Sequence, residues 1–279
     1  MSSILTNSSA LVALQTLKGI NAGLSKTQSE ISTGKAVGSA QDNAAIWAIS
    51  KTMETDQESF KTIQTNLNVA GQTVATARVG AEQVQTLLKE MKQLAIGANR
   101  SDADFATIQT QIAAKQEQIT SIVAGTQSNG VNLLSTNGVN GGATYSVLGS
   151  LDRSGATVTA SAITVDSVDF EADIVGGTVT AITDQATAAT ALDDIETLIN
   201  TAITGAAALG SAGQRISDQV NFVSKLNDSL KLGVSALVDA DMEESSARLQ
   251  ALQTQQQLGI QALSIANQAP SSILSLFRG

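Results

Sequence analysis

The sequence contains neither cysteine nor histidine, and aromatic residues make up only 3% of it. The first two absences exclude disulfides, thiol nucleophiles, imidazole bases and the usual zinc ligands. So few aromatic side chains do not suit a bulky globular core. The net charge of −9 leaves no basic patch for nucleic acid. No apolar run approaches the roughly 18 residues of a membrane span. We therefore expect no enzyme, cofactor, metal site, nucleic-acid partner or membrane insertion.

What the sequence does contain is a long apolar repeat between Ala44 and Ile96. Apolar residues recur at alternating steps of three and four, and only Asp56 interrupts them. The positions are Ile46, Ile49, Met53, Asp56, Phe60, Ile63, Leu67, Ala70, Val74, Ala77, Ala81, Val84, Leu88, Met91 and Ala95. A repeat averaging about 3.5 residues keeps one stripe of a helix facing a partner helix. At about 1.5 Å per residue the helix would be roughly 75 Å long, so it needs a partner of similar length.

A second repeat near the other end of the chain supplies this partner. It is interrupted only by Gly213 and Asn227, and its positions are Ala188, Leu192, Ile195, Ile199, Ala202, Ala206, Leu209, Gly213, Ile216, Val220, Val223, Asn227, Leu230, Val234 and Leu237. A shorter helix from Phe105 to Ile122, with Ser101 or Asp102 as its N-cap, would return along the first. We predict a mainly α fold, an elongated antiparallel rod of three helices resembling a coiled coil. Asp56 and Asn227 either specify its register or mark where the seam opens to solvent.

Residues 130–184 differ in character, because Gly, Thr, Val and Asn become frequent. Polar and apolar residues alternate at 157–159 and 163–165, which is typical of strands. Turn signals occur at 129–130, 137–138, 141–142 and 176–177. We expect hairpins and a small β-rich insertion that is exposed. An enzyme or ligand-binding module in residues 136–184 is an alternative that the missing histidine and cysteine disfavour.

Both terminal segments carry apolar residues on more than one face. Residues 4–32 are predicted to be helical, and their stripes contain Ile4, Leu5, Leu11, Val12, Leu17, Leu24 and Ile31. Asp241 is a suitable N-cap for a last helix. At 100° per residue, one face of that helix contains Leu249, Leu252, Ile260, Leu263 and Leu274, and the opposite face contains Leu258, Ile265 and Leu276. One face can pair with the first helix, so the other must meet further subunits.

Two acidic clusters invite a metal or acid–base interpretation. They are Asp239, Asp241, Glu243 and Glu244, and Asp193, Asp194 and Glu196. Helix capping and solvation explain both clusters, because a perturbed carboxylate pair requires burial that spacing alone does not indicate. We therefore assign neither cluster a catalytic role.

Several stretches resemble the bacterial flagellins, of the short kind found in alphaproteobacteria. Residues 32–35 (Ser-Thr-Gly-Lys) and 40–45 (Ala-Gln-Asp-Asn-Ala-Ala) resemble the spoke between the family's two inner domains. Residues 127–135 resemble the turn into its β-hairpin, and 239–241 resemble the start of its last helix. Residues 266–270 and 273–278 are similar to its ending. The resemblance covers roughly residues 1–135 and 185–279 and leaves the middle unmatched.

This resemblance implies a structural subunit of the extracellular flagellar filament, the propeller for swimming motility. The start of the chain lacks the basic and apolar regions of a secretory signal, and the resemblance implies type III export instead. Implied partners are further copies of the chain, other flagellins in a shared filament, the filament cap, junction proteins and an export chaperone. Inner-tube contacts are expected at the apolar residues of both terminal segments given above and at Phe277. The alternative is a hook–filament junction protein, which shares the terminal helices; the short length and the flagellin-like ending disfavour it.

The resemblance also implies a division into domains. Residues 1–43, which include the spoke, and residues 239–279 would form the two halves of the inner-tube domain. Residues 44–150, with a β-hairpin, and residues 185–238 would form the rod domain. Residues 151–184 would be the small outer excursion.

Overall fold

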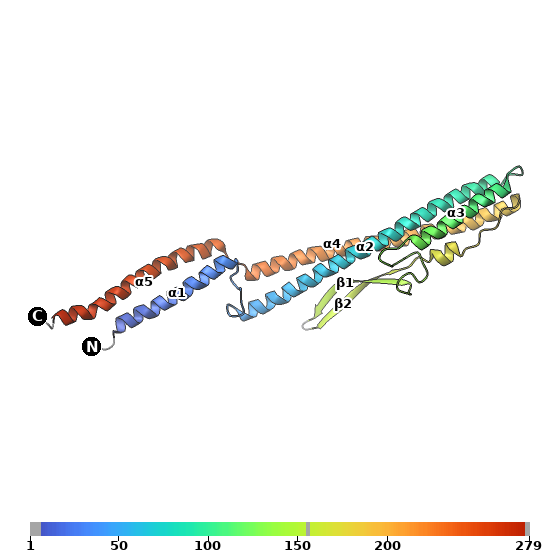
Figure 1. The fold of residues 1–279 in the computed structure, drawn as a ribbon. Helices are drawn as coiled ribbons and strands as arrows, with labels where there is room; N and C mark the ends of the chain where they lie inside the picture. The colour runs from blue at the N-terminus through green and yellow to red at the C-terminus, as the bar shows by residue number, and fades with distance from the viewer. Residues whose placement is uncertain (1–6, 155–156, 277–279) are drawn as a thin grey trace. The chain divides into compact units, whose positions relative to one another are not determined.

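The structure, a computed structural model, describes residues 7–154 and 157–276, and the side chains of these residues up to 268 (Figure 1). The described residues are mainly helical, as predicted. The two longest helices, α2 (Ala44–Ala98) and α4 (Gln185–Val238), coincide with the two apolar repeats. The contacts divide the chain into a first unit, residues 1–57 with 228–279, and a second unit, residues 58–227. This division falls inside α2 and α4, whereas the predicted limits at 43/44 and 238/239 fall at helix ends. The predicted division stays a prediction.

In the first unit, α1 (Ser8–Thr33) and α5 (Met242–Leu276) lie side by side and antiparallel (Figure 1). Asn7 caps α1 by accepting a hydrogen bond from the Ala10 N–H at 3.1 Å. The helix ends at Gly34, whose φ of 69° places it in the left-handed region that favours glycine. The connector that follows is tied to the end of α4, because the Ala36 N–H donates to the Val238 carbonyl at 2.7 Å.

In the second unit, the predicted seam of α2 forms the core. Every predicted seam residue from Phe60 to Ala95 is buried. The facing positions of α4 that are also buried are Ala188, Ile195, Ile199, Ala202, Leu209, Ile216 and Val223. Earlier in α2, in the first unit, the prediction is wrong for Ile49, whose side chain is exposed. The 3.5-residue repeat therefore identifies the core of the second unit but overestimates packing at the start of the helix.

The shorter helix is α3 (Phe105–Gly125), and its N-cap differs from the prediction. The N-cap is Asp104, which accepts hydrogen bonds from the Thr107 N–H at 3.1 Å and the Thr107 hydroxyl at 2.7 Å. Ser101 and Asp102 lie before this cap, and Asp102 instead accepts hydrogen bonds from the Arg100 guanidinium at both oxygens, at 3.0 and 2.6 Å. Lys115, the polar residue on the apolar face of α3, pairs with Glu90 of α2 at 2.6 Å.

The β-structure is one antiparallel hairpin, formed by β1 (Thr144–Ser154) and β2 (Thr157–Asp166). Both predicted strand segments lie in β2. The sequence did not indicate β1, because Gly149 forms an irregularity in its register and Asp152-Arg153 interrupts its alternation. The Gln219 side chain of α4 donates to the Gly149 carbonyl at 2.9 Å and ties the hairpin to the helix.

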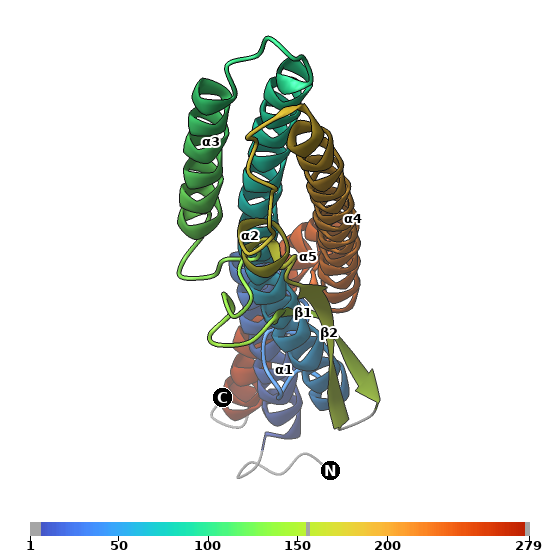
Figure 2. The same ribbon diagram turned by 90° about the vertical axis from the view of Figure 1, so that its right-hand side faces the viewer.

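Residues 167–183, which we call the strap, contain no strand and are not an exposed excursion. Phe170, Ile174 and Ile182 of the strap are buried. Its short π-helix, η1 (Glu171–Val175), lies between α3 and α4 (Figure 2). The strap thus completes the core of the second unit, and the expectation that it is exposed is wrong. Composition suggested an outer segment because Gly and Thr are frequent there, although its few large residues face inward.

Candidate functional site

The terminal helices α1 and α5 pack through one heptad stripe from each helix. The stripe of α1 consists of Ala10, Ala13, Leu17, Ile20, Leu24, Thr27 and Ile31, and Gly23 and Glu30 beside it are also only partly exposed. The stripe of α5 consists of Ser245, Leu249, Leu252, Gln256, Gly259, Leu263 and Ala266. Both sets step by three and four residues, as in a two-helix coiled coil. The helices approach closely at Gly259, where an added Cβ would lie 3.0 Å from Leu17 Cδ1.

Two polar contacts fix the antiparallel register of this pair. The Asn7 side chain donates to the Ala266 carbonyl at 2.7 Å. The Gln256 side chain donates to Asn21 Oδ1 at 2.7 Å. A one-residue slip would break both bonds, so they favour one alignment of the helices.

A second heptad stripe runs along the opposite face of α5. Its positions are Ala247, Ala251, Thr254, Leu258, Gln261 and Ile265, which follow the packed stripe by two residues and are all exposed. Leu258 is 59% exposed and Ile265 is 70% exposed. We call these six positions the outer seam. The helix therefore has two seams, and α1 fills only one of them.

The structure sorts the predicted contact residues into two groups. Half-buried residues between the helices are Leu17, Leu24, Ile31, Leu249, Leu252 and Leu263; exposed residues are Leu11, Val12, Leu258, Ile260 and Ile265. Leu274 and Leu276 lie in α5, but their side chains are beyond those described, and Ile4, Leu5 and Phe277 lie outside the described residues.

Ile260 departs from the predicted face. A helical wheel at 100° per residue groups it with Leu249 and Leu263. A seam with a 3.5-residue repeat changes its angular position relative to such a wheel along the helix. The packed position is Gly259, and Ile260 is 55% exposed. The large apolar residues alone did not indicate the small and polar members of the outer seam. Their spacing of three and four residues is the signal that identifies them.

The acidic clusters have structural partners. One Asp241 oxygen accepts hydrogen bonds from the Glu243 and Glu244 N–H groups at 2.9 and 3.1 Å, as an N-cap does. Asp194 accepts hydrogen bonds from the N–H and hydroxyl of Thr180 at 2.9 and 2.7 Å. Among residues 7–154 and 157–276, no three acidic side chains are placed to hold a metal ion. No helix within the same ranges has the length and apolarity of a membrane span.

Comparison with known proteins gives a consistent result over the whole chain. Residues 4–138 match the bacterial flagellin N-terminal helical region, and residues 192–277 match the bacterial flagellin C-terminal helical region. A crystal structure of Bacillus cereus flagellin covers 57% of this chain and 88% of its own, with a TM-score of 0.50 and 22% sequence identity. That similarity concerns the fold.

Curated relatives match from end to end. A flagellin of Brucella melitensis is 43% identical over 287 residues, covering all of both chains. The flagellin FljM of Caulobacter vibrioides is 39% identical, covering all of this chain and 99% of its own. Because these relatives are flagellins, they favour the filament subunit over a junction protein. The chain belongs to the bacterial flagellins, the structural proteins that polymerise into the extracellular filament of the flagellum.

Proposed function

We propose that the terminal helix pair carries the polymerisation contacts, with the outer seam of α5 and the exposed Leu11 and Val12 of α1 meeting neighbouring subunits. The observation that supports this proposal is the outer seam itself, a second heptad stripe left open on a helix whose first stripe is filled by α1. Exposed apolar side chains of this size on a regular stripe favour burial against another helix.

The remaining predicted residues take complementary roles in this proposal. Leu17, Leu24, Ile31, Leu249, Leu252 and Leu263 hold α1 against α5, so that the outer seam is presented on a paired helix. Ile4, Leu5, Ile260, Leu274, Leu276 and Phe277 extend the contact surface. A seam that meets a different patch on the next copy makes a heterologous contact, and such contacts produce an open helical polymer when the rotation between successive copies does not close a ring.

We further propose that the chain leaves the cell unfolded through the type III export apparatus and that its terminal segments meet an export chaperone, the filament cap and junction proteins. The resemblance in residues 32–45 and 266–278 supports these partners. The absence of cysteine is compatible with unfolded export, since no disulfide has to form or break.

Two charge substitutions in the outer seam test the polymerisation contacts. Leu258→Asp and Ile265→Asp are expected to abolish seeded polymerisation, measured by sedimentation and electron microscopy, because each places a charge in the seam. Both positions are exposed, so the monomer should keep its helix content by circular dichroism. Gln257→Asp adds the same charge on the same helix outside either stripe and is the matched control.

A third variant tests the stripe that packs on α1 separately from the outer seam. Leu263→Asp charges the face that packs on α1, so we expect it to lose polymerisation while residues 58–227 stay folded. Normal filament yield from Leu258→Asp and Ile265→Asp together would contradict the assignment of the outer seam.

A further inference from the structure

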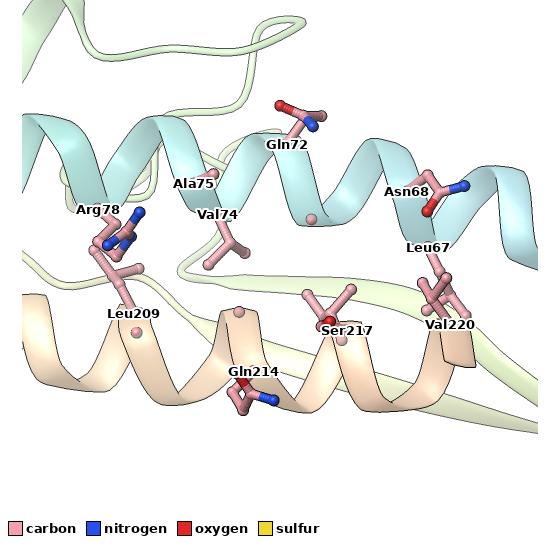
Figure 3. Close-up of a pocket in the computed structure, with 14 residues that line it drawn as sticks. Leu67, Asn68, Gln72, Val74, Ala75, Arg78, Leu209, Gln214, Ser217 and Val220 are labelled. Carbon is pink, nitrogen blue, oxygen red and sulfur yellow. The ribbon is translucent and has the colours of Figure 1, made fainter. Parts of the chain in front are cut away.

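The second unit has a groove between α2 and α4. It has a volume of about 430 Å³ and is lined by residues 67–78 of α2 and 209–220 of α4. Figure 3 shows Leu67, Val74 and Leu209 pointing into the space between the helices, whereas Gln72 and Gln214 point away from it. We call this space the α2/α4 groove. Leu67, Val74 and Leu209 pack between the two helices and are at most 1% exposed, so the accessible lining of the groove comes from small and polar residues such as Gly71, Gly213 and Ser217.

Three glycines open the groove, and contacts within the chain do not require them. A Cβ added at Gly71 or Gly213 would meet its nearest neighbour at 3.7 Å, an ordinary contact, and at Gly210 it would meet nothing within 4 Å. Each glycine inside a helix nevertheless costs about 1 kcal/mol relative to alanine. By contrast, a Cβ at Gly80 would lie 2.5 Å from the Thr126 hydroxyl. The groove glycines therefore leave room for something outside the chain.

A side chain of suitable size for this space lies on the same unit. Phe222 of α4 is 54% exposed, a large aromatic side chain left in water. It follows Gly213 by nine residues, which at 100° per residue places it about 180° around the helix from the groove. A protruding side chain and a groove thus occupy opposite faces of one helix.

The charges beside the two features are complementary. Asp218 is exposed and precedes Phe222 by one helical turn; within the chain it accepts a hydrogen bond from Gln214 at 3.0 Å. Arg78 lines the groove and pairs with Glu82 at 3.0 Å, with both side chains about half exposed. When Phe222 of one copy enters the groove of another, Asp218 can approach the Arg78 of that copy.

We propose that Phe222 and Asp218 of one subunit dock into the α2/α4 groove of a second copy of this chain. Because the two surfaces lie on opposite faces of α4, the contact is heterologous, the kind of contact from which an open filament is built. It is a contact separate from the outer seam, and it explains both the exposed aromatic residue and the glycines. An aromatic side chain that enters a pocket of the partner is the kind of residue that dominates binding energy.

Disulfide crosslinking tests this docking directly, because the natural chain has no cysteine. Lys225→Cys, which places a thiol one turn after Phe222 on the same face of α4 and leaves Phe222 in place, is mixed in equal amounts with Gly210→Cys and polymerised; the filament fraction should give crosslinked dimers under mild oxidation. Each variant polymerised alone should give few. Gly97→Cys replaces a helical glycine that also has open space around it but lies outside the groove, so Lys225→Cys mixed with Gly97→Cys is the matched control. Crosslinking no stronger than in this control, in filaments of normal yield, would overturn the proposal.

Charge reversal provides a second readout that does not depend on cysteine chemistry. Asp218→Arg is expected to raise the concentration required for polymerisation about tenfold, by analogy with the loss of one central interface contact. Combining Asp218→Arg with Arg78→Asp should restore most of the loss, because the pair is re-formed with opposite signs. No rescue in the double variant, with monomer folding unchanged, would argue against this pairing.

Discussion

Glycine has opposite roles at two positions only five residues apart on α4. At Gly205 an added Cβ would lie 2.5 Å from Phe170 Cε1 and still closer to Val168 Cγ1. Phe170 is fully buried and cannot move aside easily. We therefore expect Gly205→Ala to destabilise the protein by about 1–3 kcal/mol. Gly210→Ala should instead stabilise it by up to about 1 kcal/mol. Urea unfolding followed by circular dichroism measures both changes in stability. Equal unfolding midpoints for the two variants would show that the strap residues do not pack tightly against Gly205.

The Asp104 cap makes the start of α3 sensitive to acid. Hydrogen bonds from the side chain and backbone of Thr107 lower the pKa of Asp104 below its ordinary value of 3.8. A carboxyl whose pKa is lower in the folded state stabilises the fold fully above the unfolded pKa, and this contribution is lost as the pH falls through the folded pKa. We therefore expect the protection of amides in the first turn of α3, measured relative to their intrinsic exchange rate at each pH, to fall below about pH 4. Asp104→Asn keeps an acceptor without a charge, so its exchange should lack this acid-induced step. An unchanged step in that variant would assign it to another group.

At the scale of elements, hydrophobic periodicity predicted the buried positions of α2, because these positions repeat one helix–helix contact. The positions from Phe60 to Ala95 are buried as their spacing indicates, because a partner helix of equal length faces all of them. The strap was misjudged because its core contacts come from single residues, Phe170, Ile174 and Ile182, that no repeat connects. Burial of an isolated side chain depends on what the fold places opposite it, here Gly205 for Phe170.

The sequence predicted some of the tight turns correctly. Asn129-Gly130 forms a tight turn with φ values of 52° and 78°, as the sequence indicated. The next such turn is Asn140-Gly141, with φ values of 50° and 83°, whereas the prediction named 137–138 and 141–142, the second of which overlaps this turn by one residue. Within residues 137–142 several Asn and Gly pairs compete, and the bridge between Val139 and Gly142 selects one of them. The sequence likewise predicted the packed positions Leu249, Leu252 and Leu263 of α5. It failed at Ile260, because the packed position there is the preceding residue, Gly259.

For the whole molecule, the middle of the chain lies outside both family matches. The family matches end at residue 138 and resume at 192. The hairpin and the strap both fall in this interval, but only the strap carries fully buried aromatic and aliphatic residues of the shared core. We infer that the hairpin tolerates change in length and that the strap does not.

Excising the hairpin tests this difference. The Ser167 N–H donates to the Ala143 carbonyl at 2.7 Å, so the ends of the hairpin are adjacent and a Gly-Gly link can replace Thr144–Asp166. The excision removes the buried Val147 and Val165, each of which stabilises the fold by about 1.5–3 kcal/mol through burial. It also removes the entropic cost of ordering the hairpin residues. We expect cooperative urea unfolding at a lower midpoint, with the helical circular dichroism signal retained. Replacing strap residues 167–183 by a flexible linker should abolish the cooperative transition, because Phe170→Ala alone is expected to cost about 3–5 kcal/mol. If the hairpin excision unfolds the chain while the strap replacement leaves it cooperative, then the hairpin, and not the strap, completes the core of the second unit.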